Sequence, residues 1–162
     1  MKPNLPLLRS RAMRTQLYFF TFFAVLVGLS STKLAAQEEV TYINPRTVNE
    51  SGGPFSGAVL AGNTLYISGT LGLDANGEVP TAVDAEARNV LNNIQAQLQA
   101  AGMTMDDLVL VQVYCSDVAF YDTFNEVYRT YFSAEFPARA FLGSGTLLRE
   151  ARFEVMGIAI DR

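Results

Sequence analysis

The sequence contains no histidine, no tryptophan and a single cysteine in 162 residues. The absence of histidine excludes Ser-His-Asp and Cys-His catalytic arrangements and every metal site that depends on a histidine ligand. One cysteine cannot form a disulfide within the chain, and it cannot supply a multi-cysteine zinc or iron–sulfur site. The chain therefore lacks the residues on which many hydrolases and metalloproteins depend.

Lysine is also missing from residues 37–162, which carry seven arginines and all 16 acidic residues, for a formal net charge of −9. Without lysine this part of the chain can form no lysine Schiff base and has no P-loop lysine. Nucleic acids and anionic membrane surfaces bind basic patches, which an acidic domain does not offer. Neither is expected as a partner of residues 37–162.

Residues 1–36 differ from the rest because they contain five basic residues and no acid. Basic residues up to Arg14 precede an apolar run of 13 residues from Leu17 to Leu29. A membrane-spanning helix needs ~20 apolar residues, whereas the core of a signal peptide needs roughly 7–15. We predict a secretory signal peptide over residues 1–36, cleaved near Ala36, with an uncleaved amino-terminal anchor as the alternative. Both interpretations predict an exported protein, periplasmic or secreted.

The remaining residues, 37–162, are predicted to form one α+β domain. Gly62-Asn63 separates two apolar runs, a pattern typical of a β-hairpin. The order of elements predicts a mixed sheet with both helices on one face, and an oligomer would supply a cover for the other face. The predicted strands are Val40–Ile43, Ser56–Ala61, Thr64–Gly69, Leu108–Cys115, Ala138–Gly143 and Arg152–Ile160, and the predicted helices are 82–101 and 118–132.

Both predicted helices carry apolar residues at intervals of three and four, which indicates one buried stripe each. Thr81 is expected to cap the start of the first helix and Gly102 its end. Ser116 or Asp117 is expected to cap the second helix. Cys115, in the apolar run before it, is interpreted as an inert core thiol, since no basic residue flanks it to lower its pKa.

Two residues near the carboxyl end carry the most informative chemistry. Arg139 follows a proline at the start of a strand, and its planar guanidinium is suited to holding a carboxylate with two hydrogen bonds. Glu154 lies 15 residues further on, and an acid there can position water and move protons. If the two strands pair as a hairpin, the side chains would share a pocket. The alternative is an ordinary surface salt bridge.

Motifs around these two residues occur in a characteristic order. They are Gly53-Pro54-Phe55-Ser56-Gly57-Ala58-Val59, Tyr66-Ile67-Ser68-Gly69, Phe124-Asn125-Glu126-Val127-Tyr128 and Pro137-Ala138-Arg139, followed by Glu154. In this order the sequence resembles the reactive-intermediate deaminase family (the Rid or YjgF family of enamine/imine deaminases). The resemblance runs from about Asn44 to Asp161.

The resemblance implies a chorismate-mutase-like (YjgF-type) α+β fold, assembled as a homotrimer with sites between subunits. It also implies hydrolysis of 2-imino acids to 2-keto acids and ammonia, with no metal or organic cofactor. Arg139 would hold the substrate carboxylate and Glu154 would orient the attacking water. The residues expected to complete the cleft are Phe55, Ser68, Gly69, Asn125 and Phe141.

The chain departs from the family pattern at several positions of that cleft. Phe55 replaces a tyrosine, Gly57 and Thr70 replace glutamines, Phe141 stands where active members often carry a cysteine, and Leu148 replaces a proline. These changes predict a pocket for a larger or more apolar substrate, or weaker catalysis. One alternative function is therefore a catalytically weak or inactive trimer that binds a small carboxylate or a partner protein. Another is a structural, holdase-like trimer.

Overall fold

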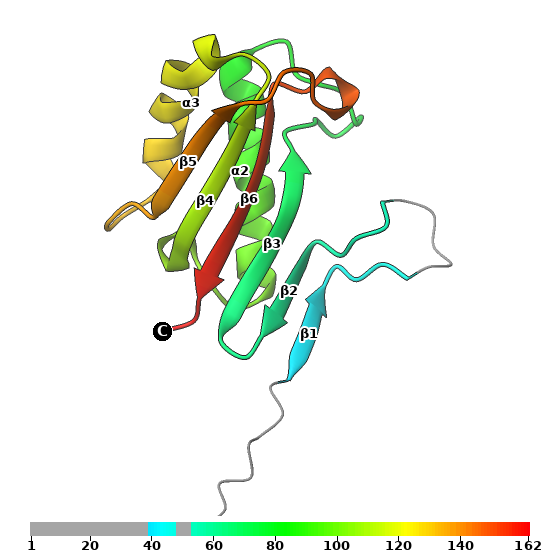
Figure 1. Cartoon of the computed structure of the whole chain (residues 1–162), viewed down its shortest axis with the longest axis vertical. Coiled ribbons are helices and arrows are strands. Elements are labelled where there is room, and N and C mark those ends of the chain that lie inside the picture. Colours follow the sequence, from blue (N-terminus) through cyan, green and yellow to red (C-terminus); the bar gives the residue numbers. More distant parts are fainter. Residues whose placement is uncertain (1–38, 48–52) are drawn as a thin grey trace, which may run out of the picture. The chain divides into compact units, whose positions relative to one another are not determined.

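The computed structural model describes residues 39–47 and 53–162. Its main elements are β1 (Val40–Ile43), β2 (Ala58–Ala61), β3 (Thr64–Leu71), α2 (Val83–Ala100), β4 (Leu108–Cys115), α3 (Tyr121–Tyr128), β5 (Ala138–Gly143) and β6 (Phe153–Ile160). The strands form one mixed sheet in the order β1-β2-β3-β6-β4-β5. Both helices lie on one face of this sheet (Figure 1), which confirms the predicted α+β architecture.

The first 38 residues lie outside the described part of the chain, and with them the predicted signal peptide. Within residues 39–47 and 53–162, no helix is long and apolar enough to cross a membrane. The domain predicted for residues 37–162 is described from Glu39 onward, apart from residues 48–52.

The predicted hairpin is confirmed as β2 and β3, which pair antiparallel with Ala61 opposite Thr64. Gly62 and Asn63 form the two-residue connection between the strands. Gly62 has a φ of 59°, a left-handed conformation that glycine adopts without steric cost. The residue pair that predicted the turn therefore makes it.

Helix α2 packs its predicted apolar stripe against the sheet. The buried members of the stripe are Ala87, Val90, Leu91, Ile94 and Leu98. Gly102 follows the helix with a φ of 80°, and its N–H donates to the carbonyl of Gln99 at 3.0 Å. The prediction that Thr81 caps the helix is wrong, because the N-cap is Ala82 and no side chain caps it.

The second predicted helix, 118–132, is divided into three pieces. The α-helical part is α3, and 3-10 turns precede and follow it at Val118–Phe120 and Arg129–Tyr131. Of the two predicted capping residues, Asp117 is the one that caps, since its side chain accepts a hydrogen bond from the N–H of Ala119 at 2.9 Å.

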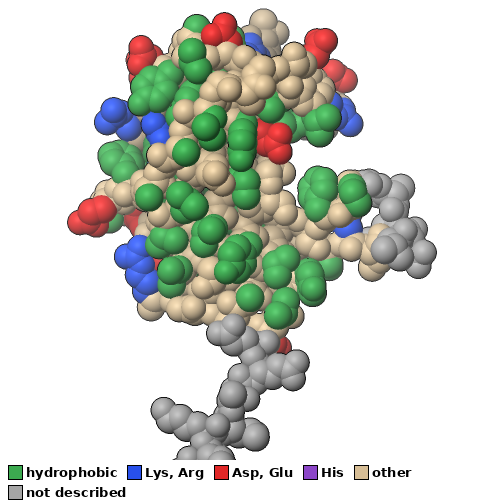
Figure 2. Space-filling view, in the orientation of Figure 1, with side chains coloured by type: hydrophobic (Ala, Val, Ile, Leu, Met, Phe, Trp, Pro, Cys, Tyr) green, Lys and Arg blue, Asp and Glu red, His purple; other side chains and the backbone are tan. Residues whose placement is uncertain are grey.

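The helix-free face of the sheet carries a broad apolar surface. Along β6, residues on the helix side are buried, whereas the alternate residues are only half-buried. The face is visible as scattered green side chains over the sheet in Figure 2. The large apolar side chains exposed on it include Tyr42, Tyr66 and Leu142. The expected uncovered face is thus present, and the oligomer that would cover it stays a prediction.

Strands β5 and β6 do not pair, which corrects the hairpin hypothesis for Arg139 and Glu154. Strand β4 lies between them and runs parallel to β5 and antiparallel to β6. Consecutive parallel strands need a crossover, which α3 supplies here between β4 and β5. The next strand, β6, then inserts between β3 and β4 instead of pairing with β5 at the edge of the sheet.

Candidate functional site: two half-sites on opposite faces of the sheet

Arg139 lies on the helix side of β5, opposite the buried Val111 of β4. Its Nη2 donates to Oδ1 of Asn125 on α3 at 2.7 Å. Its guanidinium carbon lies 4.6 Å from the centroid of the Tyr128 ring, which is a cation–π distance. These contacts hold the guanidinium plane while it lines a cavity of about 180 Å³. We call this cluster the arginine half-site.

Tyr128 is a functional candidate that the sequence patterns assigned only to helix packing. Its side chain is 4% exposed, and its hydroxyl has no hydrogen-bond partner among the described residues. Burial raises the pKa of Tyr128 to about 12, although the charge of Arg139 acts in the opposite direction. The hydroxyl is therefore protonated at neutral pH. The Tyr128 side chain lines the cavity of Arg139 and Asn125, and its hydroxyl keeps a hydrogen-bond donor without a partner among the described residues.

Phe141 lies behind the arginine half-site and lines none of the cavities described here. Its ring makes edge contacts with Tyr121 and Phe124, at centroid distances of 4.9 and 5.6 Å. Within one chain the ring therefore lies outside the cleft that Phe141 was expected to complete. The ring instead supports α3 against β5, 5.8 Å from the guanidinium of Arg139.

Glu154 lines a second and larger cavity, of about 800 Å³. Its carboxylate makes no hydrogen bond or ion pair within residues 39–47 and 53–162, and it lies against the backbone of Gly69. A Cβ built on Gly69 would be only 2.3 Å from Oε1 of Glu154. Glycine at position 69 therefore allows the acid to approach the backbone of β3. We call this cluster the acid half-site.

Ser68 and Phe55 line the acid half-site, as predicted for cleft residues. The Ser68 hydroxyl donates to the carbonyl of Ser56 at 2.7 Å, so its single proton is already used. It can still accept a hydrogen bond from a ligand. Phe55 is exposed and presents its ring to the cavity.

The two half-sites face opposite sides of the sheet within one chain. Successive side chains of a strand alternate between faces. Phe153 and Val155 are buried beneath the helices, so Glu154 between them faces the other way, whereas Arg139 lies on the helix side. No ion pair joins Arg139 and Glu154 among the described residues, and their cavities share no lining residue. The surface salt-bridge alternative is therefore wrong, and so is a shared pocket within one chain.

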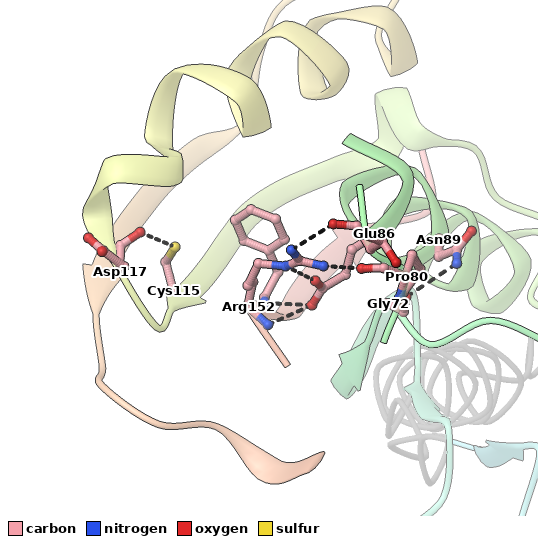
Figure 3. Close-up of polar contacts among 9 residues, drawn as sticks. Gly72, Pro80, Glu86, Asn89, Cys115, Asp117 and Arg152 are labelled. Atoms are coloured by element: carbon pink, nitrogen blue, oxygen red, sulfur yellow. Dashed lines mark hydrogen bonds and ion pairs between the residues drawn. The ribbon is translucent and has the colours of Figure 1, made fainter. Parts of the chain in front are cut away.

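A buried ion pair supports the acid half-site, and the sequence patterns did not reveal it. Glu86 of α2 is fully buried, and Oε2 accepts from Nε of Arg152 at 2.5 Å. Oε1 accepts from the backbone N–H groups of Arg152 and Phe153, at 2.6 and 3.1 Å. The guanidinium of Arg152 also donates to the carbonyls of Pro80 and Thr81. Figure 3 shows Arg152 between Glu86 and Pro80.

This pair joins three segments that border the cavity of Glu154. It fixes the start of β6, the first turn of α2 and the loop before α2. A Cβ on Gly72 would lie 2.2 Å from the carbonyl oxygen of Glu86, so only glycine fits there. Asn89 donates to the carbonyl of Gly72 at 3.2 Å, and Arg149 donates to that of Gly77 at 3.1 Å. Glu86 lies three residues after Val83 and four before Val90, so the helical spacing of the stripe of α2 also includes Glu86.

Cys115 is fully buried, as the sequence predicted. Burial raises the pKa of its thiol, and the S–H donates to the carbonyl of Asp117 at 3.0 Å. Among the described residues, no group of three or more His, Cys, Asp or Glu side chains could hold a metal ion. The polar groups of the two half-sites are an arginine, a carboxylate, a phenol, the Asn125 amide, the Ser68 hydroxyl and backbone groups.

Comparison with protein families gives a match to the family model described as Endoribonuclease L-PSP, over residues 47–161. A 2-iminobutanoate/2-iminopropanoate deaminase of Bos taurus is 43% identical over 111 residues, which cover 67% of this chain and 81% of the relative. The human protein of the same name is 39% identical over 111 residues, which again cover 67% of this chain and 81% of the relative.

Solved structures show the same fold. RidA from the Antarctic bacterium Psychrobacter superposes with a TM-score of 0.65 at 33% identity, covering 77% of this chain and 98% of that one. TdcF of E. coli, solved with bound serine, gives a TM-score of 0.69 at 28% identity, covering 75% and 99%. The matched part includes the residues of both half-sites.

Proposed function

This chain belongs to the Rid/YjgF family, to which the L-PSP family model corresponds, and we propose that it hydrolyses 2-imino acids to 2-keto acids and ammonia. The observation that carries this proposal is the arginine half-site. Arg139 is held by Asn125 and Tyr128 with its remaining N–H groups available, an arrangement suited to a carboxylate. Relatives named for this reaction, at about 40% identity, support it.

The proposed reaction needs few groups because imines already react with water. Arg139 binds the carboxylate and orients the C=N carbon. Glu154 accepts a proton from water as the oxygen bonds to that carbon and passes it to the nitrogen, which gives a carbinolamine. The carbinolamine hydroxyl then loses its proton, through Glu154, to the same nitrogen, so the C–N bond breaks, the C=O bond forms and ammonia leaves. The products are a 2-keto acid and ammonia, with no change of oxidation state. A free carboxylate at the wall of an open cavity is suited to this exchange.

We further propose that each complete site is formed by two copies of the chain. The half-sites face opposite sides of one sheet, so the arginine half-site of one copy can meet the acid half-site of the next. Such a head-to-tail contact closes into a ring when the rotation between copies allows it. A ring of three is the assembly implied by the family, and it would also cover the apolar face of the sheet.

The first experiment tests turnover. Residues 37–162 are incubated with 2-imino acids generated in situ by an amino-acid oxidase, and loss of the imine is followed by trapping it as the semicarbazone. We expect the wild-type protein to accelerate hydrolysis and Arg139→Ala to lose the effect. A folded trimer that binds small carboxylates through Arg139 without acceleration would replace this function with carboxylate binding.

The second experiment tests where the half-sites meet. Arg139→Ala and Glu154→Gln proteins are each inactive in this scheme, and they are unfolded together, mixed in equal amounts and refolded. Random assembly restores about a quarter of the sites if each site takes one half from each of two copies. Sites built within one chain would regain no activity, and a monomer by light scattering would refute the shared site.

We also propose that the protein is exported, because residues 1–36 combine a basic start with a short apolar run. The full-length chain with a carboxyl-terminal tag is expressed in a Gram-negative host. We expect the product in the periplasm or medium, with an amino terminus near Gln37 by mass spectrometry. An intact amino terminus in the cytoplasm would refute export.

A further inference from the structure

A further cavity, of about 390 Å³, adjoins the cavity of Glu154 at the edge of β3. The two cavities share four lining residues, Phe55, Ser68, Gly69 and Thr70. Among the described residues, β2 pairs with β3 only as far as Ile67, so the following stretch borders the cavities directly. Because the two cavities share these residues, a molecule held at Glu154 can extend around this edge.

The far wall of this cavity holds an amide with an unused donor. Oε1 of Gln97, on α2, accepts a hydrogen bond from Nδ2 of Asn44 at 3.1 Å. That bond orients the amide, and Nε2 of Gln97 makes no hydrogen bond within residues 39–47 and 53–162. Asn44 is itself held by the N–H of Gly57, which donates to its carbonyl at 3.3 Å. The Gln97 N–H₂ group is therefore positioned to donate to a ligand.

Glycine at position 57 makes room for this amide. A Cβ at Gly57 would lie 2.5 Å from Oε1 and 3.1 Å from Nε2 of Gln97. Any larger residue there would displace Gln97 from its present position.

We propose that this cavity is a side-chain subsite that selects 2-imino acids whose side chain ends in a carboxamide or carboxylate, as those derived from glutamine and glutamate do. The proposal rests on the deaminase function proposed above. The oxygen at the end of the side chain accepts a hydrogen bond from Nε2 of Gln97. Arg46 also lines the cavity.

The test compares imines derived from glutamine, glutamate and leucine, each generated by a suitable amino-acid oxidase. For the wild-type protein we expect kcat/KM to favour the first two over leucine by about tenfold, the size of one net hydrogen bond. Gln97→Leu removes the donor and is expected to abolish this preference. Gln99→Leu makes the same change at an exposed position of the same helix, and it should keep the preference.

A second variant guards against a folding defect in Gln97→Leu. Gln97→Glu keeps the size of the side chain and repels a carboxylate. The ratio of kcat/KM for the glutamate imine to kcat/KM for the leucine imine should therefore be lower than in the wild type. Equal rates for all three imines in the wild type would overturn the subsite while leaving the deaminase intact. Ratios of kcat/KM equal to those of the wild type in both folded variants would also overturn the subsite and leave the deaminase intact. Acceleration of none of the imines would overturn the proposed function itself.

Discussion

The arginine half-site and the acid half-site are assembled from the chain in different ways. The first comes from residues 121–139, where α3, the following turn and β5 are consecutive, and it is held by aromatic rings and the Asn125 amide. The second combines β3, the loop before α2 and the start of β6, and it depends on the Glu86–Arg152 pair. A locally built half-site tolerates distant changes, whereas one built from separate segments is sensitive to the contacts that join them.

The largest expected effect is on the contact that joins the acid half-site. Glu86→Ala leaves the half-buried Arg152 without its partner and two backbone N–H groups without their side-chain acceptor, and we expect a loss of about 3 kcal/mol in unfolding free energy. Urea denaturation measures it. Asp84→Ala removes the exposed partner of Arg88 on the same helix turn and should cost less than about 0.5 kcal/mol. Equal losses in the two variants would contradict the supporting role of the buried pair.

The next effect is on the arginine half-site and concerns activity. Arg139→Ala removes two charged hydrogen bonds to the substrate carboxylate, so kcat/KM should fall by about 100-fold to 1,000-fold. Arg139→Lys keeps the charge but loses the paired geometry and should recover only part of the rate. Thermal unfolding serves as the control. A rate for Arg139→Ala close to that of the wild type would show that another group binds the carboxylate.

A smaller loss is expected where Glu154 meets the backbone. Gly69→Ala forces the carboxylate aside, because the new Cβ would lie 2.3 Å from Oε1. Displacement of a catalytic group by about 1 Å lowers kcat by roughly 100-fold at most. If this acts through Glu154, the double variant with Glu154→Gln should be no slower than Glu154→Gln alone. Multiplied losses would indicate an independent defect.

The smallest expected effect is a change in stability at Tyr128, in the arginine half-site. Tyr128→Phe removes a buried hydroxyl without a partner among the described residues, so the isolated chain should gain about 1 kcal/mol in stability. The raised pKa also predicts how stability depends on pH. The folded state keeps the phenolic proton to a higher pH than the unfolded state, so the free energy of unfolding falls between the unfolded pKa near 10 and the folded pKa of about 12. The variant should lose that part of the alkaline decline in a denaturation series. Lower stability in the assembled protein would instead indicate a partner for the hydroxyl.

The same contrast explains what the sequence could predict. Strands β4 and β5 were predicted with the bounds they have. An apolar run rich in β-branched residues marks β4, and the motifs of the family resemblance named Arg139 and Asn125. The relation between Arg139 and Glu154 was not predictable from residue patterns, since it depends on where β6 inserts into the sheet. Glu86 escaped notice because a charged residue in a helical stripe ordinarily faces water. The position of Gln97 depends on the absence of a side chain at Gly57, and the two residues lie in segments far apart in the sequence.

The single buried cysteine gives this molecule a reporter that needs no engineering. Cys115 pairs across the sheet with Phe153, whose N–H is held by Glu86. A thiol reagent can reach the sulfur only when the packing around the end of β4 opens. The labelling rate, corrected for an unfolded chain, therefore measures the free energy of that local opening. Ligand binding at the acid half-site should slow the labelling. The labelling rate of Cys115 would then report substrate binding in the native protein.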